Sequence, residues 1–137
     1  MIKVIAFDLN GVLFPNPRKI NKKVFDFAKE CKEKGYMLVA ASNASKGSFE
    51  WRSSEYGLMD IFDGRVISSD IGMRKPSKKF FEYMVDIVGY IPQEILFIDD
   101  SDQNIESAQS LGIVSIKYEG EETLDKIREF LLNDRES

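Results

Sequence analysis

Three short apolar runs, separated from one another by amphipathic segments, constrain the fold of this chain most strongly. They span Val4–Phe7, 37–41 and 95–98, and none of them alternates between apolar and polar residues. Strands without such alternation are typical of a parallel sheet whose two faces are both covered by helices. The sequence therefore predicts an α/β domain in which helices pack on both sides of a parallel sheet.

The segments between the runs have helical periodicity. Val24, Phe27, Ala28 and Cys31 recur at spacings of three and four residues, so they share one helix face, and Cys31 is predicted to pack in the core. The other predicted helices lie at 46–56, about 77–88, about 102–111 and around 124–131. Two further strands are predicted at 65–68 and 113–116. The expected total is five strands and five helices.

Composition limits the domain organisation and the cellular location. The 137 residues, 43% of them hydrophobic, are enough for one domain over residues 1–137 with a sizeable core. The single cysteine cannot form an intrachain disulfide, and the N-terminus has no secretion-signal pattern. No apolar run approaches membrane-spanning length. We therefore expect a cytoplasmic protein that has no membrane partner.

The absence of histidine excludes several kinds of chemistry. Without histidine, and with only one cysteine, the chain cannot build a Ser-His or Cys-His catalytic pair or an ordinary zinc site. The net charge of -4 argues against a nucleic-acid partner, because binding phosphate backbones requires a basic surface. Residues 18–34 are locally basic, with seven Lys and Arg against three acidic residues, which we interpret as a solvated helix face. Any catalysis must use carboxylates, lysines, hydroxyls and backbone groups.

Polar residues stand where the predicted strands end. These residues are Asp8 after the first strand, Ser42 and Asn43 after the second, Lys75 in a short loop after the third, and Asp99 and Asp100 after the fourth. The carboxyl ends of parallel strands meet at one edge of a sheet, and ligands bind at that edge where the strand order reverses. The sequence thus predicts that four separate segments converge on one crevice.

Three of these residues suggest a metal site. The carboxylates of Asp8, Asp99 and Asp100 would repel one another in one crevice and raise one another's pKa unless a cation were present. Mg²⁺ prefers oxygen ligands and commonly joins carboxylates to a substrate phosphate. We therefore expect Mg²⁺ as the cofactor.

The same crevice contains groups suited to phosphoryl transfer. A carboxylate such as Asp8, shielded by Mg²⁺, can attack phosphorus and form an acyl phosphate. Lys75 supplies a compact positive charge, and the Ser42 hydroxyl can donate to the transferring phosphoryl group. Gly11 would let the chain turn sharply after Asp8.

Four segments resemble the motifs of the haloacid dehalogenase (HAD)-like hydrolases. They are IAFDLNGVL at 5–13, LVAASNAS at 38–45, GMRKP at 72–76 and ILFIDDSDQN at 95–104. Their order and spacing cover nearly the whole chain and differ from phosphoacceptor receiver domains, in which the acidic pair follows the first strand. The resemblance implies a three-layer α/β/α, Rossmann-like (HAD-like) fold with a five-stranded parallel sheet. It also implies a phosphatase that acts on a phosphorylated small molecule or macromolecule.

The resemblance also implies a role for each matching residue, with Asp8 as the nucleophile. The implied catalytic residues are Asp8, Asn10, Ser42 and Lys75. The implied Mg²⁺ ligands are the carboxylates of Asp8, Asp99 and Asp100 with the backbone carbonyl of Asn10. The implied phosphate-binding residues are Ser42, Asn43, Lys75 and Gly11. Asp102 and Asn104 also match the pattern, but S-D-Q-N before an apolar helix face is an ordinary helix start, and we favour a capping role for them.

Position 10 departs from the pattern of the family's phosphatases. Those enzymes carry a second Asp there, which protonates the leaving group and then activates water. Asn10 cannot exchange a proton, and loss of general acid-base catalysis typically costs ~10² to 10⁴ in rate. Three explanations stay open: an engineered change, a natural slow or silent binding module, or chemistry that does not need the proton. The alternative function is a catalytically silent domain that binds phosphate or a phosphoprotein.

The chain has no room for a cap domain over the crevice. Asp8 and Ser42 are 34 positions apart, and Ser42 and Lys75 are 33 apart. The open site suggests either a large phosphorylated substrate or a lid supplied by a second copy in a homo-oligomer.

The segment at residues 14–19, FPNPRK, which we call the flap, contains two prolines that stiffen it. Its Arg18 and Lys19 are placed either to meet a substrate anion or to form a solvated loop. For Phe49 and Trp51 in the second helix, we favour core packing over an interface patch.

Overall fold

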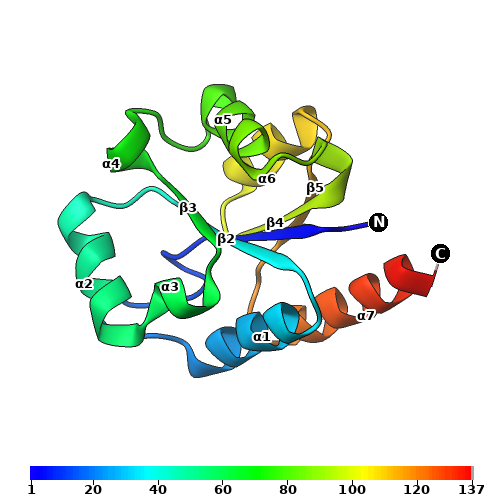
Figure 1. Ribbon diagram of the computed structural model, residues 1–137, viewed down its shortest axis with the longest axis horizontal. Coiled ribbons are helices and arrows are strands. Elements are labelled where there is room, and N and C mark those ends of the chain that lie inside the picture. Colours follow the sequence, from blue (N-terminus) through cyan, green and yellow to red (C-terminus); the bar gives the residue numbers. More distant parts are fainter. Residues whose placement is uncertain (137) are drawn as a thin grey trace.

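The computed structural model describes residues 1–136, which form a five-stranded parallel sheet between two layers of helices (Figure 1). The strands are β1 (Val4–Phe7), β2 (Met37–Ser42), β3 (Gly64–Ile67), β4 (Ile95–Asp99) and β5 (Val114–Lys117). Their order in the sheet is β3-β2-β1-β4-β5, and every neighbouring pair is parallel. The predicted α/β fold is therefore confirmed.

Seven α-helices and one 3-10 helix accompany the strands within residues 1–136, and the last helix follows the last strand. They are α1 (Lys22–Glu33), α2 (Lys46–Tyr56), α3 (Leu58–Ile61), α4 (Ser68–Ile71), α5 (Lys78–Val88), η1 (Pro92–Glu94), α6 (Asp102–Ser110) and α7 (Glu122–Glu136). The five longer α-helices are the predicted ones. The one-turn helices α3 and α4 and the helix η1 were not predicted, because three or four residues are too few to show a period.

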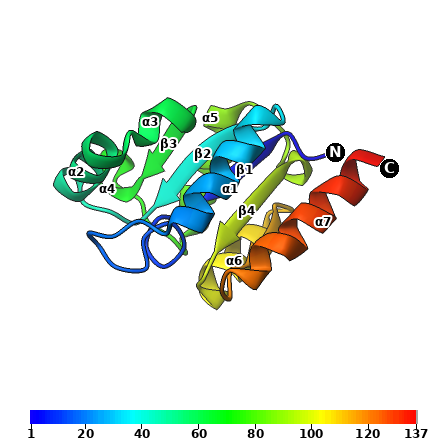
Figure 2. The same cartoon turned by 90° about the horizontal axis from the view of Figure 1, so that it is seen from below.

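Two apolar clusters explain the layers. Helices α1 and α7 lie side by side across one face of the sheet, and α5 and α6 cover the other (Figures 1 and 2). Ile5 and Phe7 of β1 pack in the cluster on the α1 side, while Val4 and Ala6 pack in the cluster on the α5 side. Because both faces of β1 are buried, its sequence is apolar throughout.

The sheet topology brings the ends of three strands together. Strand β1 is central, and its last residue, Phe7, pairs with Ala40 of β2 on one side and with Ile98 of β4 on the other. The chain adds strands outward to β3, then returns to β1 and adds β4 and β5 beyond it. The order therefore reverses beside β1, and the residues after Phe7 emerge between the carboxyl ends of β2 and β4.

The helices confirm one packing prediction and correct another. Cys31 is buried on the inner face of α1, as predicted. In α2, Phe49 is buried, but Trp51 is 41% exposed, so the prediction that both aromatics pack in the core is wrong. The buried side chains of α2 are Phe49 and Arg52, spaced three residues apart, and this spacing turns Trp51 outward.

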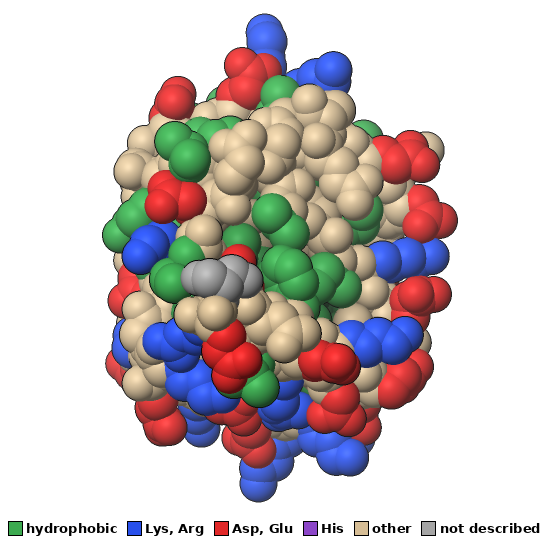
Figure 3. All heavy atoms as spheres, turned by 90° about the vertical axis from the view of Figure 1, so that its right-hand side faces the viewer, with side chains coloured by type: hydrophobic (Ala, Val, Ile, Leu, Met, Phe, Trp, Pro, Cys, Tyr) green, Lys and Arg blue, Asp and Glu red, His purple; other side chains and the backbone are tan. Residues whose placement is uncertain are grey.

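The opposite edge of the sheet carries the amino ends of the strands and both chain ends. Figure 3 shows this side, with apolar side chains gathered at its middle and charged ones around them. Met1 and Tyr90 line a hollow of about 180 Å³ there. Among residues 1–136, no helix combines the length and the apolar character needed to cross a bilayer.

Candidate active site

The predicted acidic residues meet at the carboxyl edge of the sheet. Asp8 directly follows β1, Asp99 is the last residue of β4, and Asp100 comes next. Each of the three offers a carboxylate oxygen, and these atoms lie within 4.8 Å of one another. Asp8 and Asp99 are buried, whereas Asp100 is exposed. The cluster therefore opens to solvent at Asp100.

Lys75 joins two of these carboxylates. Its buried Nζ donates hydrogen bonds to Asp8 Oδ1 at 2.8 Å, to Asp99 Oδ2 at 2.7 Å and to the Ala41 carbonyl at 2.9 Å. An ammonium group has three N–H donors, so all three are used. The ion pairs hold the carboxyl ends of β1 and β4 to the loop that carries Lys75.

The Asn43 side chain holds the backbone of Lys75 in place. Its side-chain Oδ1 accepts from the backbone N–H of Lys75 at 2.8 Å, and its Nδ2 donates to the Lys75 carbonyl at 2.9 Å. This pairing fixes the Lys75 loop against the end of β2. The sequence predicts a substrate contact for Asn43. It gives no sign of the hydrogen bonds to the Lys75 backbone, because these depend on how the loop that carries Lys75 packs.

Burial controls the ionisation of Asp8. Loss of solvent raises the pKa of Asp8 to about 7, and the positive charge of Lys75 opposes that rise. The negative charges of Asp99 and Asp100 raise this pKa further. A cation near these carboxylates would favour the ionised form of Asp8 and make it available as a nucleophile.

Asn104 belongs to this cluster, contrary to the sequence prediction. The N-terminus of α6 is capped by Ser101, whose Oγ accepts from the Asn104 backbone N–H. The Asn104 side chain is buried and donates from Nδ2 to Asp99 Oδ2 at 3.1 Å. Asp102 is the first helical residue and pairs with Lys117 at 3.0 Å. The predicted helix start is therefore confirmed, with Ser101 as its cap, but the Asn104 side chain contacts Asp99 instead of capping the helix.

The turn after β1 brings Gly11 against Asp100. Gly11 has a φ of 88°, which favours glycine, and a Cβ there would overlap the Asp100 carboxylate. Asn10 is exposed, and its Nδ2 donates to the Asn43 carbonyl at 3.1 Å. The Asn10 amide thus ties the β1 turn to the loop after β2.

Two buried donors of this region lack an acceptor. Ser42 Oγ, at the end of β2, has no hydrogen-bond partner, as a donor intended for a substrate oxygen would. Arg52 Nη1 is also buried without a partner. Sequence analysis missed Arg52, and the available signal was its spacing of three residues from the apolar Phe49 on α2.

The ligand set fits Mg²⁺. The clustered side chains offer only oxygen atoms, one of the carboxylates is open to solvent, and Mg²⁺ prefers few carboxylates together with water. The residues that would hold the ion are Asp8, Asp99 and Asp100, and the Asn10 carbonyl stays a prediction as a further ligand.

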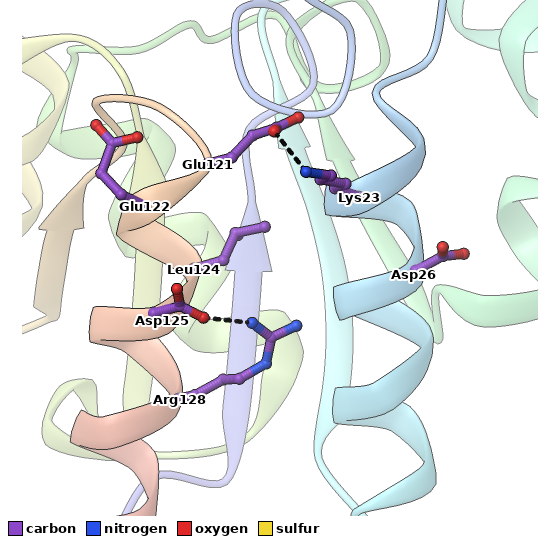
Figure 4. A pocket seen from close by; sticks show the side chains of 7 residues that line it. All are labelled: Lys23, Asp26, Glu121, Glu122, Leu124, Asp125 and Arg128. Atoms are coloured by element: carbon purple, nitrogen blue, oxygen red, sulfur yellow. Dashed lines mark hydrogen bonds and ion pairs between the residues drawn. The ribbon is translucent and has the colours of Figure 1, made fainter.

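One cavity lies away from this cluster. It has a volume of about 520 Å³ and lies between α1 and α7, where charged side chains from both helices line it (Figure 4). Its lysine and its arginine are each paired with a carboxylate. It contains none of the predicted site residues.

Comparison with protein families gives one match that covers most of the chain. The sequence pattern of the haloacid dehalogenase-like hydrolases matches residues 5–118. This range includes every predicted site residue.

Curated relatives include two phosphatases. A sesquiterpene phosphatase of Aspergillus oryzae is 30% identical over 106 residues, covering 77% of this chain and 52% of the relative. A D-ribitol-5-phosphate phosphatase of Bacteroides thetaiotaomicron is 30% identical over 92 residues, covering 63% of this chain and 45% of the relative. The chain spans about half or less of the length of the curated relatives it matches.

Solved structures share the fold. A protein of Porphyromonas gingivalis assigned to the HAD-like hydrolases superposes with a TM-score of 0.83 at 21% identity, covering 96% of this chain and 98% of the other. A HAD family enzyme of Bacteroides thetaiotaomicron, in complex with magnesium and inorganic phosphate, superposes with a TM-score of 0.77 at 18% identity. That alignment covers 87% of this chain and 95% of the other.

Proposed function

The chain belongs to the haloacid dehalogenase-like hydrolases, and from this premise we propose that it hydrolyses phosphomonoesters through a phosphorylated Asp8. The observation that carries the proposal is the group around Asp8. Its buried carboxylate is bonded to Lys75, and Ser42 Oγ at the end of the neighbouring strand is a buried donor without an acceptor. This arrangement provides a nucleophile, a fixed cation and a free donor at one sheet edge.

In the first step, an Asp8 carboxylate oxygen attacks the phosphorus of the ester. The P–O bond to the leaving group breaks as the new bond forms, and the leaving oxygen then takes a proton from solvent water. Ser42 Oγ donates to a phosphoryl oxygen, and the charge of Lys75 attracts the phosphoryl group electrostatically. Mg²⁺, when bound, would neutralise the negative charge shared by the carboxylates and the phosphate.

In the second step, water attacks the phosphorus of the acyl phosphate. The P–O bond to Asp8 breaks, which returns the carboxylate and releases inorganic phosphate. Asn10 can neither give the proton in the first step nor take one in this step, and its amide is already bonded to the Asn43 carbonyl. We therefore expect slow turnover.

The relatives support a phosphorylated substrate. Both the A. oryzae and the B. thetaiotaomicron relatives are phosphatases, and a structural neighbour holds magnesium with inorganic phosphate. Mg²⁺ is accordingly part of the proposal. The exposed Asp100 and Asn10 leave the crevice open to solvent on one side.

The presence of Asn10 favours a second candidate function, that of a catalytically silent domain that binds phosphate or a phosphorylated partner. Such a domain would keep the carboxylates, Lys75 and Ser42 but would not turn over. Titration with Mg²⁺ does not separate the two functions, because both retain the same ligands.

The test measures Mg²⁺-dependent phosphate release from an aryl phosphate. The chain is compared with its Asn10→Asp variant, and the double variant Asp8→Asn with Asn10→Asp is the blank. We expect Asn10→Asp to raise the rate by ~10² or more and the blank to lose it.

Mass spectrometry of the chain after incubation with the ester provides a second readout. The phosphatase proposal expects a phosphoryl adduct on Asp8, since attack does not require a proton from residue 10. Equal inactivity of all three proteins, with no adduct, would favour the silent binding domain.

A further inference from the structure

Arg52 has an unusual place for an arginine. It lies on α2, and its side chain is 2% exposed. Among the residues that the structure describes, Lys75 and Arg52 are the two buried basic side chains. The three N–H donors of Lys75 are all occupied by protein acceptors. Arg52 is thus the buried cation that retains a donor without a partner.

The contacts of Arg52 position its guanidinium beneath the flap. Nε donates to the Pro17 carbonyl at 3.1 Å, and the guanidinium lies 4.6 Å from the centre of the Phe14 ring. These contacts fix the plane of the group but leave Nη1 buried and unpaired. A buried N–H of a charged group without an acceptor is costly, so such a group is kept where an acceptor arrives.

The guanidinium is within electrostatic reach of the nucleophile. Burial lowers the pKa of Arg52, and the negative charge of Asp8 acts against that change. The flap and α2, which surround Arg52, both follow closely on site residues. The flap comes soon after Asp8, and α2 begins four residues after Ser42. Figure 1 shows α2 at the same end of the sheet as the β1 turn.

The charges of the site leave a phosphate incompletely balanced. Three carboxylates face one lysine, and a Mg²⁺ ion would bring their sum to about neutral. A phosphate dianion then adds negative charge with no further buried cation except Arg52. An arginine is suited to this role because its planar group stays charged and donates to phosphate or carboxylate oxygens.

We propose that Arg52 is a substrate-binding residue whose Nη1 donates to an anionic oxygen of the phosphorylated substrate. The proposal rests on the phosphatase function and extends it to substrate recognition. The oxygen comes either from the phosphoryl group or from an anionic leaving group, and the experiment distinguishes these sources.

The experiment measures equilibrium dissociation constants by calorimetry, in Mg²⁺, for the full chain and its Arg52→Lys and Arg52→Met variants. The three probes are inorganic phosphate, propyl phosphate and 3-phosphonooxypropanoate, which is propyl phosphate with its terminal methyl replaced by a carboxylate. We expect Arg52→Met to weaken binding about tenfold or more, as for loss of a charge-assisted hydrogen bond, and Arg52→Lys to weaken it less. If the Arg52 variants bind inorganic phosphate more weakly than the unchanged chain does, the oxygen that Nη1 contacts belongs to the phosphoryl group. If the variants lose only the preference for 3-phosphonooxypropanoate over propyl phosphate, the oxygen belongs to the leaving group.

Two control variants separate anion binding from flap anchoring and from ring stacking. Tyr56→Phe removes the hydrogen bond from Tyr56 to the Arg18 carbonyl, which is another contact of α2 with the flap, and leaves Arg52 in place. Arg65→Met removes an arginine that also stacks on a phenylalanine but has its own carboxylate partner, Asp70. We expect both controls to bind all three probes as the unchanged chain does. Thermal unfolding of each variant verifies folding, and Arg52→Lys serves if Arg52→Met does not fold.

Three results would overturn the assignment. They are unchanged binding in both Arg52 variants, equal weakening in Tyr56→Phe, and absence of probe binding to the unchanged chain. Failure of the phosphatase function gives a different pattern, in which the probes bind and depend on Arg52 but no phosphate is released and no adduct forms.

Discussion

The carboxyl edge of the sheet and the cavity between α1 and α7 both gather charged side chains, but they differ in how these charges are paired. In the cavity, Lys23 Nζ lies 3.2 Å from Glu121 Oε1, and Arg128 Nη1 lies 3.0 Å from Asp125 Oδ1 (Figure 4). These side chains are between 39% and 83% exposed. Water can therefore replace each partner at little cost.

At the carboxyl edge, Asp8, Lys75 and Asp99 are buried, and the pairing of the buried polar groups is incomplete. Lys75 is 2% exposed and holds two carboxylates, while Ser42 and Arg52 each keep a buried donor without an acceptor. The Ser42 hydroxyl and the Arg52 Nη1 are thus unmet donors that a ligand oxygen could satisfy. The cavity between α1 and α7 therefore holds charges that are already paired and hydrated, whereas the proposed site holds buried charges.

The largest expected difference between the two regions is in the free energy of unfolding. Lys75→Met leaves Asp8 and Asp99 buried without their cation, which should destabilise the metal-free protein by about 3–5 kcal/mol. Arg128→Met removes a half-exposed cation and should cost about 1 kcal/mol or less. Urea unfolding at pH 7 without metal measures both. Equal losses would mean that the two regions do not differ in pairing.

A smaller effect is expected in the pH dependence of stability without metal. The pKa of Asp8 is about 7 in the folded protein, against an ordinary value of 3.8. Between these values the folded state retains a proton that the unfolded state has lost, so the free energy of unfolding falls as pH rises. The contribution of Asp8 is fully present below 3.8 and is lost as pH passes 7.

The measurement compares urea unfolding of the chain and of Asp8→Asn at several pH values in a chelator. Asp8→Asn should show a shallower decline, because an amide does not titrate. Glu121→Gln, in the cavity between α1 and α7, should follow the unchanged chain. Parallel curves for the chain and Asp8→Asn would contradict the raised pKa.

The smallest effect is expected for the Lys23–Glu121 pair. Both side chains are well exposed, and such pairs contribute about 0.2–1 kcal/mol, which salt screens further. Glu121→Gln should therefore shift the urea midpoint only slightly, and less at high salt. A large shift that persists in salt would show that the cavity charges are less hydrated than their exposure indicates.

The sheet and the acidic cluster could be predicted because apolar runs fix the strands and parallel strands share one carboxyl edge. Asp8, Ser42, Lys75 and Asp99 meet there because each closely follows a predicted strand. Their shared edge depends on topology and not on detailed packing. The proximity of these residues could thus be predicted from segments far apart in the sequence.

The remaining residues depend on tertiary contacts that local patterns do not contain. Asn104 was interpreted as a cap because S-D-Q-N fits a helix start equally well, and only the proximity of Asp99 decides its role. Arg52 and Trp51 are neighbours on α2 with burial opposite to their usual tendencies. Arginine is buried there because the flap supplies the Pro17 carbonyl and the Phe14 ring.

The central place of β1 also has a consequence for folding kinetics. Val4 pairs with Met37 on one side and with Ile95 on the other, so β1 is complete only after distant segments have closed on it. Contacts between distant segments form slowly, because chain entropy is lost before they are made. Helical content should therefore recover early during refolding. The proposed phosphate site, which needs the β1 and β4 ends together, should recover last and report the completed native state.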